Sequence, residues 1–136
     1  MHAGAREAGT PEALMRSRYT AFALGLGAYL VRTLASTHPD RAAPNDVLAR
    51  ELSRAHERQR FLGLRVLHTA TTGDEGEVLF HARVFERGAD RSFAELSTFV
   101  KEGEAWRYAD GLLVPAAKLP RDLDALTRDS FVALAT

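Results

Sequence analysis

Apolar and polar residues alternate from residue 93 to residue 111, which predicts two strands joined by a tight turn. The segment reads FAELSTFVKEGEAWRYADG. Glu102 and Gly103 lie between its two halves, and glycine supplies the positive φ that a hairpin turn needs. Successive side chains of a strand point to opposite faces of a sheet, so the length of the turn decides which residues lie opposite each other.

A turn of two or four residues places Glu95 opposite Asp110. It also places Ser97 opposite Tyr108, whereas a turn of three residues separates the two carboxylates. In the first register, one face has the composition of a cavity wall: Phe93, Glu95, Ser97, Phe99, Trp106, Tyr108 and Asp110. The other face carries mainly small residues: Ala94, Leu96, Thr98, Val100, Ala105 and Ala109.

The first part of the chain has the periodicity of helices. Thr10 is a suitable N-cap and predicts a first helix that runs to about residue 24. The glycines that follow predict a break and then a second helix over residues 28–35. A third helix is predicted from Asn45, with that residue as its cap and its apolar face turned inward.

From residue 61 the pattern changes from helical to alternating. Strands are predicted over residues 61–71 and 77–86, the second with Val78, Phe80, Ala82 and Val84 on one face. The hairpin described above completes a four-stranded antiparallel sheet. Helices followed by a run of strands indicate an α+β fold in which the helices cover one face of the sheet.

The length of 136 residues corresponds to one domain. Residues 1–9 are small and polar and are predicted to be a flexible lead-in. Residues 10–117 form the α+β domain. Residues 118–136 are predicted to form a C-terminal helix that begins at Leu119, because the apolar residues that follow have helical spacing.

The composition narrows the possible partners. Eighteen basic and eighteen acidic residues give a net charge of zero, so no overall field attracts nucleic acid. The chain has no cysteine, which excludes disulfides, thiolate catalysis and Cys-ligated zinc. The apolar run over residues 20–31 is shorter than the roughly 20 residues of a membrane span. A cytoplasmic protein without membrane or nucleic-acid partners is expected.

Four segments together resemble a known family. The run TPEALMRSRYTAFALG at residues 10–25 resembles the opening of the middle domain of the YchJ family. Thr37-His38-Pro39, Phe61-Leu62-Gly63-Leu64 and the hairpin signatures ExSxF and WxYxDG follow in the order of that family. The resemblance implies a nuclear transport factor 2-like (cystatin-like) fold, in which three N-terminal helices pack as a cone over a strongly curved sheet.

The same resemblance implies a Cys-rich zinc module before this domain, as in SEC-C motif proteins. The segment before residue 10 contains no cysteine, so the zinc function is not carried over. Whether Met1 marks a natural short form or a trimmed one stays open. The family is largely uncharacterised, so the resemblance implies little about chemistry.

Arg18 lies on or beside the buried stripe of the first helix, which we expect to pack over the face that carries Glu95 and Asp110. One interpretation is an internal ion pair that docks the helix onto the sheet. The other is the polar floor of an apolar pocket that orients a small ligand or a water molecule. The pocket candidates are Arg18, Tyr19, His38, Glu95, Ser97, Phe99, Trp106, Tyr108 and Asp110.

Each candidate also has a simpler interpretation. Aromatic side chains at alternating positions are more often simply core, and a capping or loop-packing role for His38 is favoured over an acid-base role. No two histidines have the spacing of metal ligands and no Gly-rich phosphate loop is present, so neither a metal nor another cofactor is expected. No catalytic residue is assigned, because a serine nucleophile would need a histidine that this register does not place.

Three functions remain open. The first is a non-catalytic module that binds a small ligand in its pocket, or another protein chain through the outer face of the sheet as a homodimer. The second is a small-molecule enzyme of the isomerase or dehydratase type that uses a pocket carboxylate. The third is an accessory domain to the zinc module.

Overall fold

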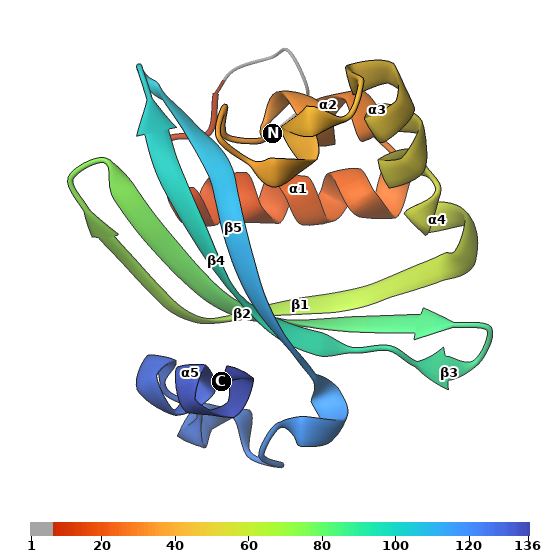
Figure 1. Ribbon diagram of the computed structural model, residues 1–136. Helices are drawn as coiled ribbons and strands as arrows, with labels where there is room; N and C mark the ends of the chain where they lie inside the picture. The colour runs from red at the N-terminus through yellow and green to blue at the C-terminus, as the bar shows by residue number, and fades with distance from the viewer. Residues whose placement is uncertain (1–6) are drawn as a thin grey trace.

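The computed structural model describes residues 7–136 and has an α+β architecture (Figure 1). Its helices and 3₁₀ turns are α1 (Pro11–Leu24), α2 (Gly27–Arg32), η1 (Pro39–Ala42), α3 (Asn45–Ser53), α4 (Ala55–Arg58), η2 (Ala116–Lys118), η3 (Leu123–Ala125) and α5 (Arg128–Ala135). Its strands are β1 (Gln59–Thr72), β2 (Glu75–Glu86), β3 (Ala89–Asp90), β4 (Phe93–Glu102) and β5 (Ala105–Pro115). Within this part of the chain, no helix has the length and apolar composition that crossing a membrane requires.

The first helix follows its predicted capping signals. Thr10 is the N-cap of α1, and its hydroxyl accepts a hydrogen bond from the amide of Ala13 at 3.1 Å. The helix ends at Gly25, which has a left-handed φ of 72°. The prediction of Asn45 as the cap of α3 is wrong. Pro44 takes the N-cap position with an extended backbone and no side-chain hydrogen bond, so the helix includes Asn45.

The sheet is antiparallel with the strand order β1-β2-β4-β5, and the short β3 pairs with β2. The predicted α+β fold with a curved antiparallel sheet is confirmed, although β3 was not predicted. Register shifts interrupt β1 twice and β5 once, and such bulges bend and twist a sheet. Helices α1 to α4 lie on one face of the curved sheet and α5 lies on the other (Figure 1).

The two faces of the sheet carry separate cores. The face toward α1 packs Leu14, Met15, Val78, Phe80, Ala82, Val84, Phe99 and Trp106 into one cluster. The opposite face packs Leu79, Ala94, Leu96, Val114, Leu126 and Phe131 into another. Because strand residues alternate between faces, β2 and β4 contribute to both clusters and are covered on both sides.

The C-terminal helix is shorter than predicted. The prediction that it begins at Leu119 is wrong, since α5 begins at Arg128 and only short 3₁₀ turns precede it. Thr127 and Ser130 form a capping box, in which each side chain bonds the backbone amide of the other. This strong cap sets the start of α5, although the apolar periodicity extends further back.

The C-terminal segment covers part of the face for which a homodimer contact is predicted. Ala94 and Leu96 are buried in the same cluster as Phe131 of α5. Thr98 is exposed and Val100 is half-buried, and neither belongs to this cluster. The homodimer stays a prediction for this remaining part of the outer face.

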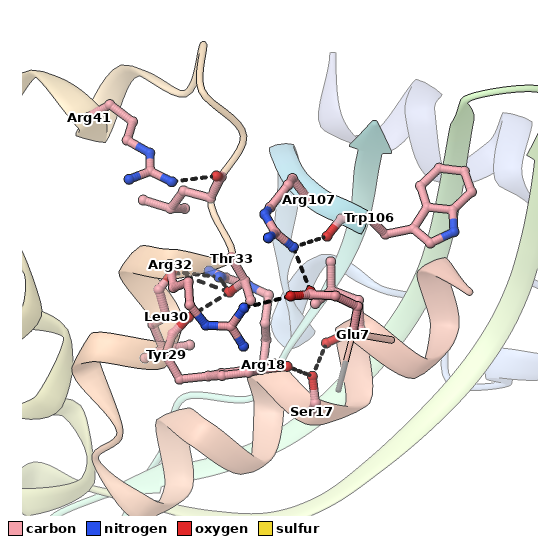
Figure 2. A network of polar contacts seen from close by, with 12 residues as sticks. Glu7, Ser17, Arg18, Tyr29, Leu30, Arg32, Thr33, Arg41, Trp106 and Arg107 are labelled. Carbon is pink, nitrogen blue, oxygen red and sulfur yellow. Dashed lines mark hydrogen bonds and ion pairs between the residues drawn. The ribbon is translucent and has the colours of Figure 1, made fainter. Parts of the chain in front are cut away.

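The start of the described chain packs against the domain. Residues 1–6 of the predicted flexible lead-in lie outside the described part of the chain. Ala8 is only 4% exposed and belongs to the core beneath α1. The carboxylate of Glu7 accepts hydrogen bonds from Arg32 at 2.8 Å and from Arg107 at 2.9 Å (Figure 2). These contacts tie the segment before α1 to both α2 and β5.

Removing the Phe131 side chain is expected to destabilise the whole domain. Phe131 is fully buried between α5 and the sheet, and a Phe to Ala change in a core costs about 3–5 kcal/mol. Urea unfolding of Phe131→Ala measures this loss. The matched control is Leu134→Ala on the same helix, because Leu134 is 44% exposed and should change stability by less than about 1 kcal/mol. Equal losses in both variants would show that α5 does not pack as described.

Candidate functional site

A cavity of about 260 Å³ lies between α1 and the concave face of the sheet. Ligand pockets usually span about 300–1,000 Å³. This cavity is slightly smaller, so it suits only a small molecule. Its apolar walls are Met15, Phe22, Leu34, Leu52, Phe61, Phe80, Phe93 and Phe99. The side chains with polar groups are Arg18, Tyr19, His38, Asp40, Glu95, Ser97 and Tyr108.

Glu95 projects from β4 into this cavity and is held by one of its two oxygens. Its Oε2 accepts hydrogen bonds from the hydroxyl of Ser97 at 2.5 Å and from that of Tyr108 at 2.9 Å. No partner for Oε1 is found among the described residues, and none of their fully buried side-chain oxygens lacks a partner. Oε1 is therefore not fully buried, and Glu95 lines the cavity.

Gly111 makes room for this carboxylate and its phenol partner. It lies on β5 directly opposite Ser97. A methyl group at this position would overlap both the Tyr108 hydroxyl and the Glu95 carboxylate. The absence of a side chain at Gly111 therefore allows Tyr108 to reach along its strand to Glu95.

The predicted pairing of Glu95 with Asp110 is wrong. The turn has two residues, but they are Gly103 and Glu104 and not Glu102 and Gly103, so Tyr108 lies opposite Phe99 instead of Ser97. A bulge at residue 109 then shifts the register again. Glu95 consequently lies opposite Leu113. Asp110 is exposed outside the cavity, and its carboxylate accepts a hydrogen bond from the amide of Gly111 at 2.8 Å. The two acids therefore do not form a shared floor.

Arg18 is almost completely buried, with 7% of its surface exposed. Its Nη1 donates to the carbonyl of Leu30 at 2.8 Å and to the hydroxyl of Thr33 at 2.5 Å (Figure 2). Its guanidinium also lies 4.7 Å from the centre of the Tyr108 ring, a cation–π distance. The interaction docks α1 onto the end of α2, which is a structural role.

The predicted ion pair of Arg18 with the two acids is wrong. Within the described residues, Arg18 pairs with neither Glu95 nor Asp110, because its Nη1 is committed to the oxygens at the end of α2. Burial lowers the pKa of Arg18 to about 10, so the group remains a cation at neutral pH. Its Nε and Nη2 have no protein partner in the described part of the chain and are not sealed. Arg18 lines the cavity with these donors free.

Two other candidates line the cavity but have structural partners. The Nδ1 of His38 accepts a hydrogen bond from the amide of Asp40 at 3.0 Å and caps η1. The hydroxyl of Tyr19 donates to the carbonyl of Gly63 at 3.0 Å and accepts from its amide at 3.1 Å. Both contacts fix loops or strands around the cavity, which fits the loop-packing interpretation of His38.

Trp106 lies away from the cavity. It is 5% exposed, belongs to the core cluster with Leu14 and Phe99, and lies opposite Lys101 on β4. The ammonium of Lys101 is 5.9 Å from its ring. Trp106 is therefore a core residue and its assignment to the cavity wall is wrong.

The surroundings of Glu95 make its ionisation less favourable than that of an exposed carboxyl group. Burial raises the pKa of Glu95, while the hydrogen bonds from Ser97 and Tyr108 and the charge of Arg18 oppose this effect only in part. Burial and the nearby carboxylate also raise the pKa of Tyr108, which therefore remains a neutral donor. The site thus combines a protonatable carboxyl group, a neutral phenol and a buried cation.

The backbone holds Tyr108 in place. On one side it pairs with Phe99 of β4. On the other, its amide donates to the carbonyl of Thr33 and its carbonyl accepts from the amide of Ala35, both at 2.8 Å. The segment that leaves α2 thus forms a short parallel bridge with the edge of β5.

Some lining residues were outside the sequence-based selection. Met15, Phe22 and Leu52 are on predicted inward helix faces, and Phe80 is on an alternating strand face, so their periodicity was a usable signal. Asp40 lies in the short 3₁₀ turn η1 after α2 and has no such signal. The described residues contain no group of three acidic or histidine side chains that could hold a metal ion.

Gly111→Ala is expected to disrupt the contact between Glu95 and Tyr108. The added methyl group must displace one of these side chains, and such overpacking costs about 1–3 kcal/mol. Thermal and urea unfolding measure the loss. The control is Gly63→Ala, another strand glycine, where only the Cδ of Arg83 lies within 4.0 Å of the new atom. A similar effect in both variants would contradict the close approach.

Glu95→Gln is expected to change how stability depends on pH. A carboxyl group with a raised pKa in the folded state ionises less readily there than in the unfolded chain. Wild-type protein should therefore lose stability relative to Glu95→Gln as pH rises from the ordinary value of 4.5 through the folded pKa. Urea unfolding at a series of pH values measures the difference. Glu104→Gln in the exposed turn is the control, and a Glu95→Gln curve parallel to that of wild type would contradict the raised pKa.

Comparison with known proteins agrees with this fold and places the chain in a family. Residues 10–111 match the family described as the YchJ middle NTF2-like domain. A UPF0225 protein from Geobacter sulfurreducens is 42% identical over 112 residues, which cover 79% of this chain and 66% of that protein. The chain thus spans slightly less than two thirds of the length of this relative.

Solved structures give the same result. A SEC-C motif containing protein from Rhodopseudomonas palustris matches with a TM-score of 0.66 and 40% identity, covering 78% of this chain and 80% of that one. A domain of unknown function with a cystatin-like fold from Nostoc punctiforme matches with a TM-score of 0.60 and 17% identity, covering 90% and 88%, and shows the fold alone. The resemblance predicted from the sequence is confirmed, and the chain belongs to the family of the YchJ middle NTF2-like domain.

Proposed function

We propose that this domain is a non-catalytic module that binds a small, largely apolar molecule inside its cone. The observation that carries the proposal is the combination of apolar cavity walls with two polar groups that have free hydrogen-bonding capacity, Glu95 and Arg18. Ligand sites commonly have this composition, in which apolar walls provide affinity and a few polar groups fix orientation. Ordinary core packing would leave no such space beside a carboxyl group.

A small enzyme is the second candidate, and one observation favours it. The carboxyl group of Glu95 has a raised pKa and an accessible oxygen, as a general acid or base requires. His38 lines the same cavity, but its Nδ1 already accepts the amide of Asp40. The binding module therefore ranks first, since no second proton-transfer group is placed beside Glu95 by a hydrogen bond to a histidine or another acid among the described residues.

Interactions with other chains rank lower. The C-terminal segment occupies much of the outer face through Phe131 and Leu126, which leaves a smaller surface for a homodimer. A role as accessory to a zinc module concerns longer relatives, because the Geobacter sulfurreducens protein extends beyond the matched region. Neither alternative makes use of the cavity.

Binding of aromatic probes tests the proposal. We expect 2-naphthoate, its neutral analogue 2-naphthamide, or both to bind at up to millimolar concentration and to shift the amide NMR signals of β4 and β5. Leu52→Trp should weaken this binding by at least about tenfold, or about 1.4 kcal/mol, because Leu52 lines the cavity and the larger indole fills it. The control is Leu24→Trp at a position that is 61% exposed and outside the cavity.

Two outcomes would contradict the proposal. One is the absence of binding by both probes to folded wild-type protein. The other is an equal loss of affinity in Leu52→Trp and Leu24→Trp, which would place the probe elsewhere on the molecule.

A further inference from the structure

We propose that the cavity takes a small organic carboxylate as its ligand, and that Glu95 takes up one proton from solvent when this anion binds. The inference rests on the proposed function and deepens it by naming the chemical class of the ligand and the charge change that accompanies binding. It follows from the way in which hydrogen bonds and charges are distributed around Arg18 and Glu95.

The available donors favour an anion. Arg18 is 7% exposed, and among the described residues only its Nη1 has hydrogen-bond partners, Leu30 and Thr33. Nε and Nη2 have no partner among the described residues and are not fully buried, and Arg18 lines the cavity. A guanidinium presents its donors in a planar fork that matches a carboxylate. An apolar ligand with one carboxylate would satisfy both the free donors and the aromatic walls.

The available acceptor belongs to Glu95. Oε2 of Glu95 already accepts from Ser97 and Tyr108, so it is the poorer position for a proton. Oε1 has no donor among the described residues and is not fully buried, and Glu95 lines the cavity. A proton on Oε1 would convert this atom from a repulsive acceptor into a donor for the ligand carboxylate.

The charge balance explains why the proton is taken up. In the empty cavity, the cation of Arg18 favours the ionised form of Glu95 against the effect of burial. Tyr108 lies between the two, with its ring 4.7 Å from the guanidinium and its hydroxyl 2.9 Å from Glu95 Oε2. A bound carboxylate would neutralise Arg18 and add a second negative charge beside Glu95. Two carboxylates in one poorly solvated site share a proton, because both cannot remain ionised.

The other titratable groups around Glu95 do not supply the positive charge that Arg18 provides. Tyr108 on β5 remains neutral because its pKa is raised by burial, and Asp110 on the same strand is exposed and favours the protonated form of Glu95. On the far wall, the side chain of Asp40 is 54% exposed and lies 4.0 Å from His38. Arg18 of α1 is the only arginine or lysine among the described residues that line the cavity.

Isothermal titration calorimetry with the full chain tests the inference. We would titrate 2-naphthoate at pH 7 in buffers of different ionisation enthalpy, because the dependence of the observed heat on the buffer gives the number of protons exchanged. We expect a net uptake of up to one proton, and an affinity that falls by up to about tenfold for each pH unit above the pKa of Glu95 in the ligand-free protein. 2-Naphthamide should bind without proton uptake.

Glu95→Gln tests whether Glu95 is the group that takes up the proton, and it leaves the cavity in place. This variant keeps the size of the side chain, so it should bind 2-naphthoate with no proton uptake and with little pH dependence. Glu104→Gln in the exposed turn should behave like wild type. If Glu95→Gln fails to fold, the proton count of the wild-type protein still decides the question.

The outcomes distinguish the inference from the function on which it rests. Binding of 2-naphthoate to wild type without proton uptake, or undiminished uptake in Glu95→Gln, would overturn the role of Glu95. Binding of 2-naphthamide alone would overturn the anionic ligand class but would agree with the proposed binding function. Absence of binding by both probes would overturn the proposed function itself.

Discussion

The buried guanidinium of Arg18 is the contact on which the site depends. It joins α1 to the last carbonyl and hydroxyl groups of α2, and its flat face packs against the ring of Tyr108. Burying a cation is costly unless hydrogen bonds and nearby negative charge compensate it. Here the direct contacts of the guanidinium are neutral oxygens and an aromatic ring, so the carboxyl group of Glu95 is not held in a direct ion pair. The helices are thereby docked while the acid remains free.

Much of the fold could be predicted because local rules determine it. The cap at Thr10, the change of period at residue 61 and the order of helices before strands all follow from short-range patterns. The C-terminal helix shows the limit of periodicity. Apolar residues at helical spacing precede Thr127, yet the capping box places the start of the helix there. A pattern can therefore predict that a helix exists better than it predicts where the helix begins.

The site was predicted in composition but not in geometry. Glutamates flank Gly103 on both sides, so the alternation alone allows either pair as the turn. The bulge at residue 109 adds a second shift that no local signal announces. Glu95 nevertheless lines the cavity as predicted, since strand alternation fixes the face of the sheet to which it points. Asp110 and Trp106 do not line the cavity. Strand alternation was thus more reliable than the pairing across the hairpin.

The parallel bridge between Leu34 and Tyr108 has a consequence for recognition. It holds the backbone of Tyr108 from the side that β4 does not reach, so the phenol is attached to two segments that are far apart in the sequence. Ordering a side chain and its loop at the moment of association weakens binding by an entropic penalty. For the ligand proposed above, that penalty would already have been met during folding, because the shape of the site around Tyr108 is set in advance.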